Sequence, residues 1–188
     1  KRELNWMTNY FSTGVWAGEQ APGTVWSNYT GSDPIGDLET GIETILGETG
    51  FRPNILTVGY RVWRFLKHHP DIVDRVKFTG GPGQDMKMAL ADLLEIDNIY
   101  VAQSIRNTQA EGVTPVFAFN AGRNALLSYA PASPGLLAPT AGYNFVWTGY
   151  AGGLGTDITI SRIDIPETKA TRIEGEEAYD FKVIGDDL

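Results

Sequence analysis

The chain changes its side-chain pattern midway, and this change limits the folds open to it. Between about residues 33 and 96, apart from a short strand pattern at 55–58, apolar residues recur at the three- and four-residue spacing of helices. From Val113 onward they follow the short, alternating pattern of strands. The sequence therefore predicts an α+β fold with antiparallel sheets and about three helices.

The clearest helix is predicted over residues 33–50. Asp33 suits the N-cap, because its carboxylate can accept hydrogen bonds from free backbone N–H groups, and Pro34 suits the first helical position. Gly50 can end the helix and Pro53 prevents it from resuming. The face expected to point inward carries Ile35, Leu38, Ile42, Ile45 and Leu46.

The remaining elements are predicted from shorter patterns. Helical pieces are expected at 60–68, 70–77 and 85–96, and strands at 55–58, 98–104, 113–119, 125–129, 143–150 and 158–165. Residues 176–184 are expected to form a further strand, or a short helix and a strand. Glycine-rich loops are expected at 80–83 and 151–155, the second joining the strands 143–150 and 158–165 as a hairpin.

The first 32 residues are rich in aromatic side chains. After a short helical tail, Ser, Thr, Gly and Asn fall between the aromatic residues, which favours strands and turns. Three of the five tryptophans lie here, including Trp16 and Trp26. Such a ribbon must lie against the rest of the domain or against a neighbouring molecule.

Composition excludes several classes of protein. The chain has 188 residues and no cysteine, which rules out a disulfide scaffold, a thiol nucleophile and a cysteine-ligated metal site. Its net charge of −8 disfavours binding of nucleic acid through the whole surface. No apolar run approaches the roughly 20 residues of a membrane span, so no membrane partner is expected.

The residues that could carry out catalysis are few. His68 and His69 are the only histidines, and because adjacent helical residues point in different directions they make a poor metal pair. No serine lies in a nucleophile motif, and the loop at 80–83 lacks the Lys-Ser/Thr that a phosphate-binding loop needs. We therefore expect no enzyme, no cofactor and no metal, although aromatic residues beside paired acids leave a carbohydrate-binding or carbohydrate-cleaving module open.

Charge is segregated along the chain. Residues 33–48 hold five acids and no base, residues 52–77 hold six bases and two acids, and residues 164–188 hold eight acids and three bases. Opposite patches on one small body suit head-to-tail contact between identical copies. The alternative is that these charges pair within the chain or remain solvated.

The candidate interface residues are Arg61, Arg64, Lys67, Asp37, Glu39, Glu43, Trp16 and Trp26.

Five segments, in order, resemble one family. They are ELNWMTNYFSTGVW (3–16), PNILTVGYRVWRFLKHHPDIVDRV (53–76), LADLLEIDNIYVAQSIRNTQAEG (90–112), NALLSYAPASPGLLAPTAGYNFVW (124–147) and EAYDFKVIGDDL (177–188). Together they resemble the major capsid proteins of tailed bacteriophages.

The resemblance implies a fold, a function and a set of partners. The fold is the capsid-shell fold shared with encapsulins and herpesvirus capsid floors, with an axial lobe at 33–140 and a peripheral lobe at 1–32 and 141–188. The function is that of a structural subunit, which assembles with itself into pentamers and hexamers around phage DNA, without sequence-specific binding. Scaffolding, portal and decoration proteins are the further partners, and the location is the virion, with assembly in the host cytoplasm.

The chain also departs from that family. The N-terminal arm, the extended hairpin loop and most of the long spine helix have no counterpart in this sequence, so we expect a core fragment. An encapsulin-like nanocompartment shell, with protein cargo in place of DNA, is the alternative within the same fold.

Overall fold

The computed structural model describes residues 2–77, 85–135, 137–147 and 159–188. The chain divides into two compact units, Lys1–Ala141 with Gly185–Leu188, and Gly142–Ile184. The first unit contains α1 (Arg2–Asn9), α2 (Pro34–Thr49), β1 (Ile55–Gly59), α3 (Tyr60–Leu66), α4 (Pro70–Val76), α5 (Met86–Leu94), β2 (Asn98–Ala102), β3 (Ile105–Asn107), β4 (Phe117–Phe119) and β5 (Ala125–Ser128). The second contains β6 (Gly142–Val146), β7 (Thr159–Ile165), β8 (Ala170–Glu176) and β9 (Tyr179–Val183).

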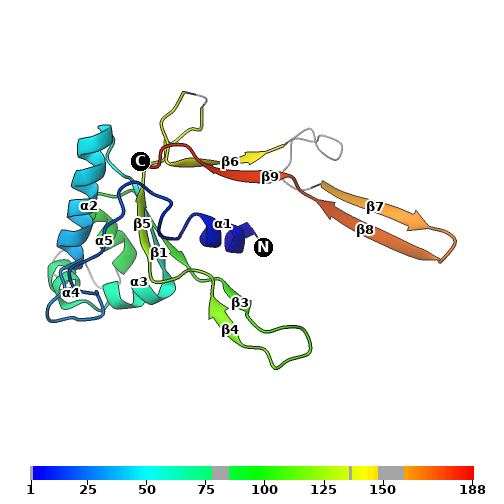
Figure 1. Ribbon diagram of the computed structural model, residues 1–188, viewed down its shortest axis with the longest axis horizontal. Helices are drawn as coiled ribbons and strands as arrows, with labels where there is room; N and C mark the ends of the chain where they lie inside the picture. The colour runs from blue at the N-terminus through cyan, green and yellow to red at the C-terminus, as the bar shows by residue number, and fades with distance from the viewer. Residues whose placement is uncertain (1, 78–84, 136, 148–158) are drawn as a thin grey trace. The chain divides into compact units, whose positions relative to one another are not determined.

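A three-stranded sheet organises the first unit (Figure 1). Its order is β2-β1-β5, with β1 parallel to β2 and antiparallel to β5. The strands β1 and β2 can be parallel because the three helices between them, α3, α4 and α5, return the chain from the end of β1 to the start of β2. The α+β class is confirmed, although the described residues hold five helices rather than about three.

The two faces of this sheet are covered by different helices. Leu127 packs with the core cluster formed by α2, α3, α4 and α5, whereas its neighbour Leu126 packs with Met7 and Phe11. Successive side chains of a strand point to opposite faces, so α1 and the residues after it cover the face that the other helices leave open. The main core is fully apolar at its centre, with Leu56, Leu66 and Leu90 all inaccessible to solvent.

Helix α2 begins and ends as the sequence predicts. The Asp33 side chain accepts a hydrogen bond from the Gly36 N–H at 3.0 Å, and Pro34 opens the helix. Gly50 closes it with a φ of 75°, a left-handed conformation that glycine adopts without strain. The prediction of the inward face is wrong at one residue, because Leu46 in the last turn is exposed.

Asn54 holds the N-terminal end of the sheet together. Its Nδ2 donates to the carbonyl of Ala130 at 2.9 Å and its Oδ1 accepts from the Ala130 N–H at 3.0 Å. Its own carbonyl accepts from the N–H groups of Asp97 and Asn98. Through its side chain and its backbone carbonyl together, Asn54 thus joins the entry to β1, the entry to β2 and the exit from β5.

The second unit consists of two antiparallel ribbons. β6 pairs with β9, so that Gly142 lies opposite Val183, and β7 pairs with β8, so that Thr159 lies opposite Glu176. The predicted hairpin between 143–150 and 158–165 is therefore wrong, because each of these strands pairs with a later one. Strand β8 escaped prediction because its alternating positions are charged rather than apolar, as in Arg172 and Glu174.

Other sequence-based expectations need correction. Residues 10–32 form turns and bends and no strand. The strand expected at 113–119 is confined to Phe117–Phe119, since the preceding residues form a loop closed by side-chain hydrogen bonds. The glycine-rich loops at 80–83 and 151–155 lie outside the described residues.

Candidate subunit interface

Helix α3 carries the predicted basic row. The inward face of this helix is formed by Val62, Trp63 and Leu66, which are buried in the main core. Arg61 and Arg64 are three positions apart and both exposed, while Lys67 is half-buried at the C-cap. Burial of one side of α3 therefore fixes these cations on its outer side.

The two arginines contact rings rather than acids. The guanidinium carbon of Arg61 lies 5.7 Å from the centre of the Phe119 ring, and that of Arg64 lies 4.9 Å from the ring of Phe65. No ion pair joins Arg61, Arg64 or Lys67 to an acid in the part of the chain that the structure describes. A cation over an aromatic ring keeps its charge, and both arginines are exposed, so this row remains available to an anionic surface.

The predicted acidic row lies on α2. Glu39 and Glu43 are exposed, and neither is ion-paired with another described residue. Asp37 is half-buried and accepts a hydrogen bond from the indole N–H of Trp26 at 2.7 Å. Asp37 therefore has an intramolecular role that the two glutamates lack.

Trp16 and Trp26 are tied into their own chain. The indole N–H of Trp16 donates to the carbonyl of Tyr10 at 2.7 Å, and Trp26 packs against the main core beside α2. Both side chains are half-buried. The chain thus covers, with its own residues, much of the aromatic surface that the sequence left open to a neighbouring molecule.

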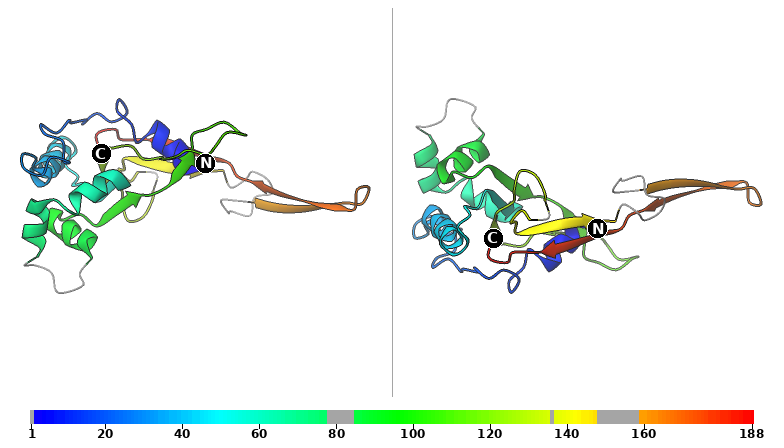
Figure 2. Two further views of the ribbon diagram at one scale, coloured as in Figure 1. Left: turned by 90° about the horizontal axis from the view of Figure 1, so that it is seen from below. Right: turned by 90° about the horizontal axis from the view of Figure 1, so that it is seen from above.

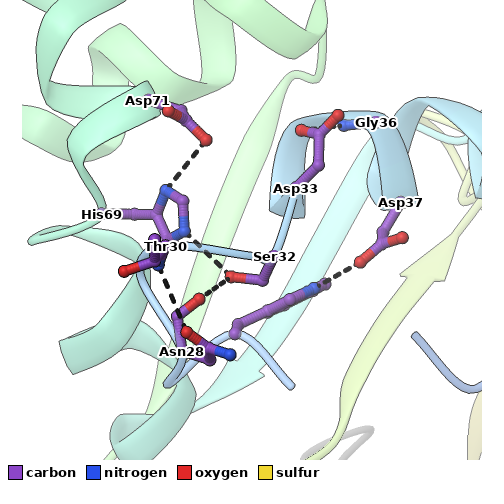
Figure 3. Close-up of polar contacts among 9 residues, drawn as sticks. Asn28, Thr30, Ser32, Asp33, Gly36, Asp37, His69 and Asp71 are labelled. Atoms are coloured by element: carbon purple, nitrogen blue, oxygen red, sulfur yellow. Dashed lines mark hydrogen bonds and ion pairs between the residues drawn. The ribbon is translucent and has the colours of Figure 1, made fainter. Parts of the chain in front are cut away.

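A buried polar cluster links the loop before α2 to the start of α4 (Figure 3). His69 is fully buried, its Nε2 lies 3.0 Å from Ser32 Oγ, and its Nδ1 lies 3.5 Å from Asp71 Oδ2 without a hydrogen bond. Ser32 Oγ in turn donates to the Asn28 carbonyl at 2.7 Å. The sequence predicts that the two histidines are either structural or solvated. His69 is structural, because its side chain is buried.

The order of donors in this cluster differs from that of an activated serine. The Asn28 carbonyl can only accept, so we assign the Ser32 hydroxyl as its donor; with that proton used, the Ser32 oxygen accepts from His69 in its Nε2–H tautomer. A general base needs the reverse, with a lone pair on the ring nitrogen facing the hydroxyl proton. The cluster therefore fastens the 28–32 loop to α4.

Within the described ranges, no cluster of three or more His, Asp or Glu side chains is arranged to hold a metal ion. Nor does any helix in those ranges combine the length and the apolarity needed to cross a membrane.

Known proteins resemble this chain in sequence and in fold. No protein-family model matches it. It is 32% identical to the major capsid protein of Burkholderia phage BcepMu over 107 residues, which are 56% of this chain and 33% of that protein. It is 32% identical to the major capsid protein of Pseudomonas phage JBD67 over 91 residues, which are 48% of this chain and 28% of that protein.

A solved structure shares the fold. A phage-related protein from Bordetella bronchiseptica RB50 superposes with a TM-score of 0.70 and 22% sequence identity, covering 89% of this chain and 52% of that one. The sequence matches span about a third of the length of the two phage proteins. The chain is therefore similar in sequence to two phage major capsid proteins over about a third of their length.

Proposed function

We propose that this chain is a structural subunit of a phage capsid and that it assembles with copies of itself. The similarity to two proteins named as major capsid proteins carries this proposal, because both matches fall at 32% identity. The fold shared with a phage-related protein agrees with it. A structural rather than a catalytic role also fits the buried Ser32–His69 contact, which fastens a loop.

The contact between copies is proposed to join the basic row of α3 to the acidic row of α2. Arg61, Arg64 and Lys67 would face Glu39 and Glu43 of the next copy. Two different surfaces that bind each other form a heterologous contact, which closes into a ring when the rotation between copies divides a full turn. Pentamers and hexamers are such rings.

The larger assembly is part of the same proposal. Rings would join into an icosahedral shell in the virion, formed in the host cytoplasm, with scaffolding, portal and decoration proteins as partners. An axial lobe at 33–140 and a peripheral lobe at 1–32 and 141–188 remain the proposed lobes. The net charge of −8 would let an inner surface lie beside packed DNA without adhering to it.

A charge-reversal experiment tests the contact and the function together. In the full-length product of the gene that encodes this chain, Arg64→Glu should reduce assembly into rings or shells, as seen by electron microscopy and sedimentation. Adding Glu43→Arg should restore part of the loss, since it recreates an opposite-charge pair. Unchanged assembly in Arg64→Glu would refute this contact, and a wild-type product that remains monomeric under all salt conditions, with its scaffolding protein present, would refute the function.

A further inference from the structure

The strands β3 and β4 form an arm that leaves the body of the first unit (Figure 1). We define the β3–β4 arm as residues 104–120. At its base the Asn120 Nδ2 donates to Ser104 Oγ at 2.7 Å and the Asn120 N–H donates to the Ser104 carbonyl. At the far end of the strands, Asn107 Oδ1 accepts from the N–H groups of Gln109 and Val116, both at 3.1 Å. Both ends of the two strands are therefore fixed by side chains.

One face of the arm is largely apolar, and Ile105 and Phe117 on it are exposed. Ile105 lies opposite Phe119 and Asn107 lies opposite Phe117, so these four side chains share a face. Ile105 is 56% exposed and Phe117 is 64% exposed. Tyr60 of α3 stacks on Phe119 with ring centres 5.5 Å apart, which extends the apolar face onto the body of the unit.

Such a face is unusual for an arm in contact with water alone. An isolated two-stranded ribbon is at best marginally stable, and large exposed apolar patches usually mark binding surfaces. Hydrogen bonds from polar side chains hold the two strands of the arm together, whereas its apolar side chains remain exposed and contribute little to its stability. An ordered arm of this kind binds at low entropic cost, because little conformational freedom remains to be lost.

The surroundings of the apolar face are basic. Arg61 lies over Phe119, and Arg106 lies on the opposite face of β3, where its position pairs with Ala118. The matching surface would be apolar with acids around it. Helix α2 has that character at its C-terminal half, where Leu46 and the following Phe51 are exposed and Glu43 and Glu48 are exposed beside them.

The arm and α2 cannot meet within one chain. They lie on opposite sides of the first unit in all three views of the molecule (Figures 1 and 2). We propose that the β3–β4 arm docks on the α2 surface of a second copy of this chain, with Phe117 against Leu46 and Phe51. This inference rests on the proposed self-assembly and names the apolar contact that would lie beside the charged one.

The absence of cysteine in the chain makes the test direct. In the full-length product, Phe117→Cys combined with Leu46→Cys should form disulfides between copies under mild oxidation. Because the two sites lie on different surfaces, each copy can link to two others, and a non-reducing gel should show a ladder of multimers. An intramolecular disulfide needs Cα atoms within about 7 Å, which the positions of these elements exclude.

Met88 provides the matched control. It is 64% exposed, the same fraction as Phe117, and lies on α5. Met88→Cys with Leu46→Cys should give at least roughly tenfold less ladder, because only docked sites have a high effective concentration of each other. Equal ladders from the two pairs would overturn the proposed docking, as would a ladder from the control pair alone.

A second variant separates this inference from the proposed function. Phe117→Ser should weaken self-association roughly tenfold or more, as truncation of a central interface aromatic does, while Met88→Ser should not. Circular dichroism of both variants would show whether the fold is kept. If the wild type assembles and Phe117→Ser assembles equally well, the docking is wrong and the capsid function stands; if the wild type forms no assembly, the function itself is wrong.

Discussion

At the scale of single residues, the positions of loops in the first unit depend on a few polar side chains. Apolar packing alone would leave these loops free to shift. His69 has no solvent exposure, and its ring also meets the edge of Tyr29, with ring centres 5.6 Å apart. Ser32 Oγ accepts the hydrogen bond of this ring and donates its own proton to the Asn28 carbonyl. A buried polar group is costly when it lacks a partner, so such a contact allows only a narrow set of loop positions.

Replacing Ser32 by alanine should test this contact. Ser32→Ala leaves the Nε2–H of His69 buried without an acceptor, and we expect a loss of about 1–3 kcal/mol in the free energy of unfolding, measured by urea denaturation. Thr30→Ala is the control, since the Thr30 backbone N–H, not its side chain, donates to Asn28 Oδ1. That exposed substitution should change stability by less than about 0.5 kcal/mol. Equal stability of the two variants would contradict the structural role of the cluster.

Asn54 offers a sharper residue-scale test because a substitution of the same shape exists. Asn54→Asp places a carboxylate oxygen where Nδ2 now donates to the Ala130 carbonyl, and the same nitrogen is 3.2 Å from Asp97 Oδ2. We expect destabilisation by about 1–3 kcal/mol near neutral pH, because a donor is lost and like charges meet. Asn98→Asp adds the same charge at an exposed position nearby and should have little effect. A neutral result for Asn54→Asp would rule out this bridge.

At the scale of elements, α2 shows how far local sequence determines structure. Its cap, its first turn and its final glycine were all predictable, because each depends on residues within a few positions of each other. It also presents two surfaces, one packed into the main core and one bearing Glu39 and Glu43. The positions of these two glutamates therefore depend on how stably α2 is formed.

Removing the cap of α2 should measure that dependence. Asp33→Ala takes away the acceptor for the Gly36 N–H and should cost about 0.5–2 kcal/mol in the free energy of unfolding. Glu39→Ala removes an acid from the same helix without removing a described contact, and it should be nearly neutral in the same denaturation assay. A larger effect from Glu39→Ala than from Asp33→Ala would mean that the cap does not stabilise α2.

What the sequence could not reveal lies in pairing between distant segments. The strands at Gly142–Val146 and Thr159–Ile165 were recognised, but their partners β9 and β8 were not, because alternation shows that a residue is in a strand and not which strand lies beside it. The same limit hid the contact of Ser32 with His69, 37 positions later. The candidate charges were predictable because helical spacing alone places Arg61 and Arg64 on one side of α3.

At the scale of the whole molecule, the two units differ in how much of their surface is covered. The first unit has a continuous core between its helices and its three-stranded sheet. In the second unit β7 and β8 leave Ile160 and Ile173 exposed, and the ion pairs along them, Arg162–Asp164 and Arg172–Glu174, join residues two apart on the same strand. The apolar side chains of this ribbon are therefore left without a core of their own.

Salt should reveal the charged part of the proposed assembly. Raising sodium chloride shortens the Debye length from about 10 Å at 0.1 M to about 3 Å at 1 M, so a contact between the α3 and α2 rows should weaken. In analytical ultracentrifugation of the full-length product, the wild type should dissociate progressively as salt rises. The Arg64→Glu variant, which has already lost one attraction, should show a smaller change over the same range. An identical salt response in both would show that Arg64 takes no part in the contact.

Electron microscopy of the full-length gene product, expressed with its scaffolding protein, tests most directly whether this chain belongs to a self-assembling shell subunit. We expect closed icosahedral particles, tubes or rings of five and six copies. Monomers alone, at high protein concentration and across a range of salt, would contradict it.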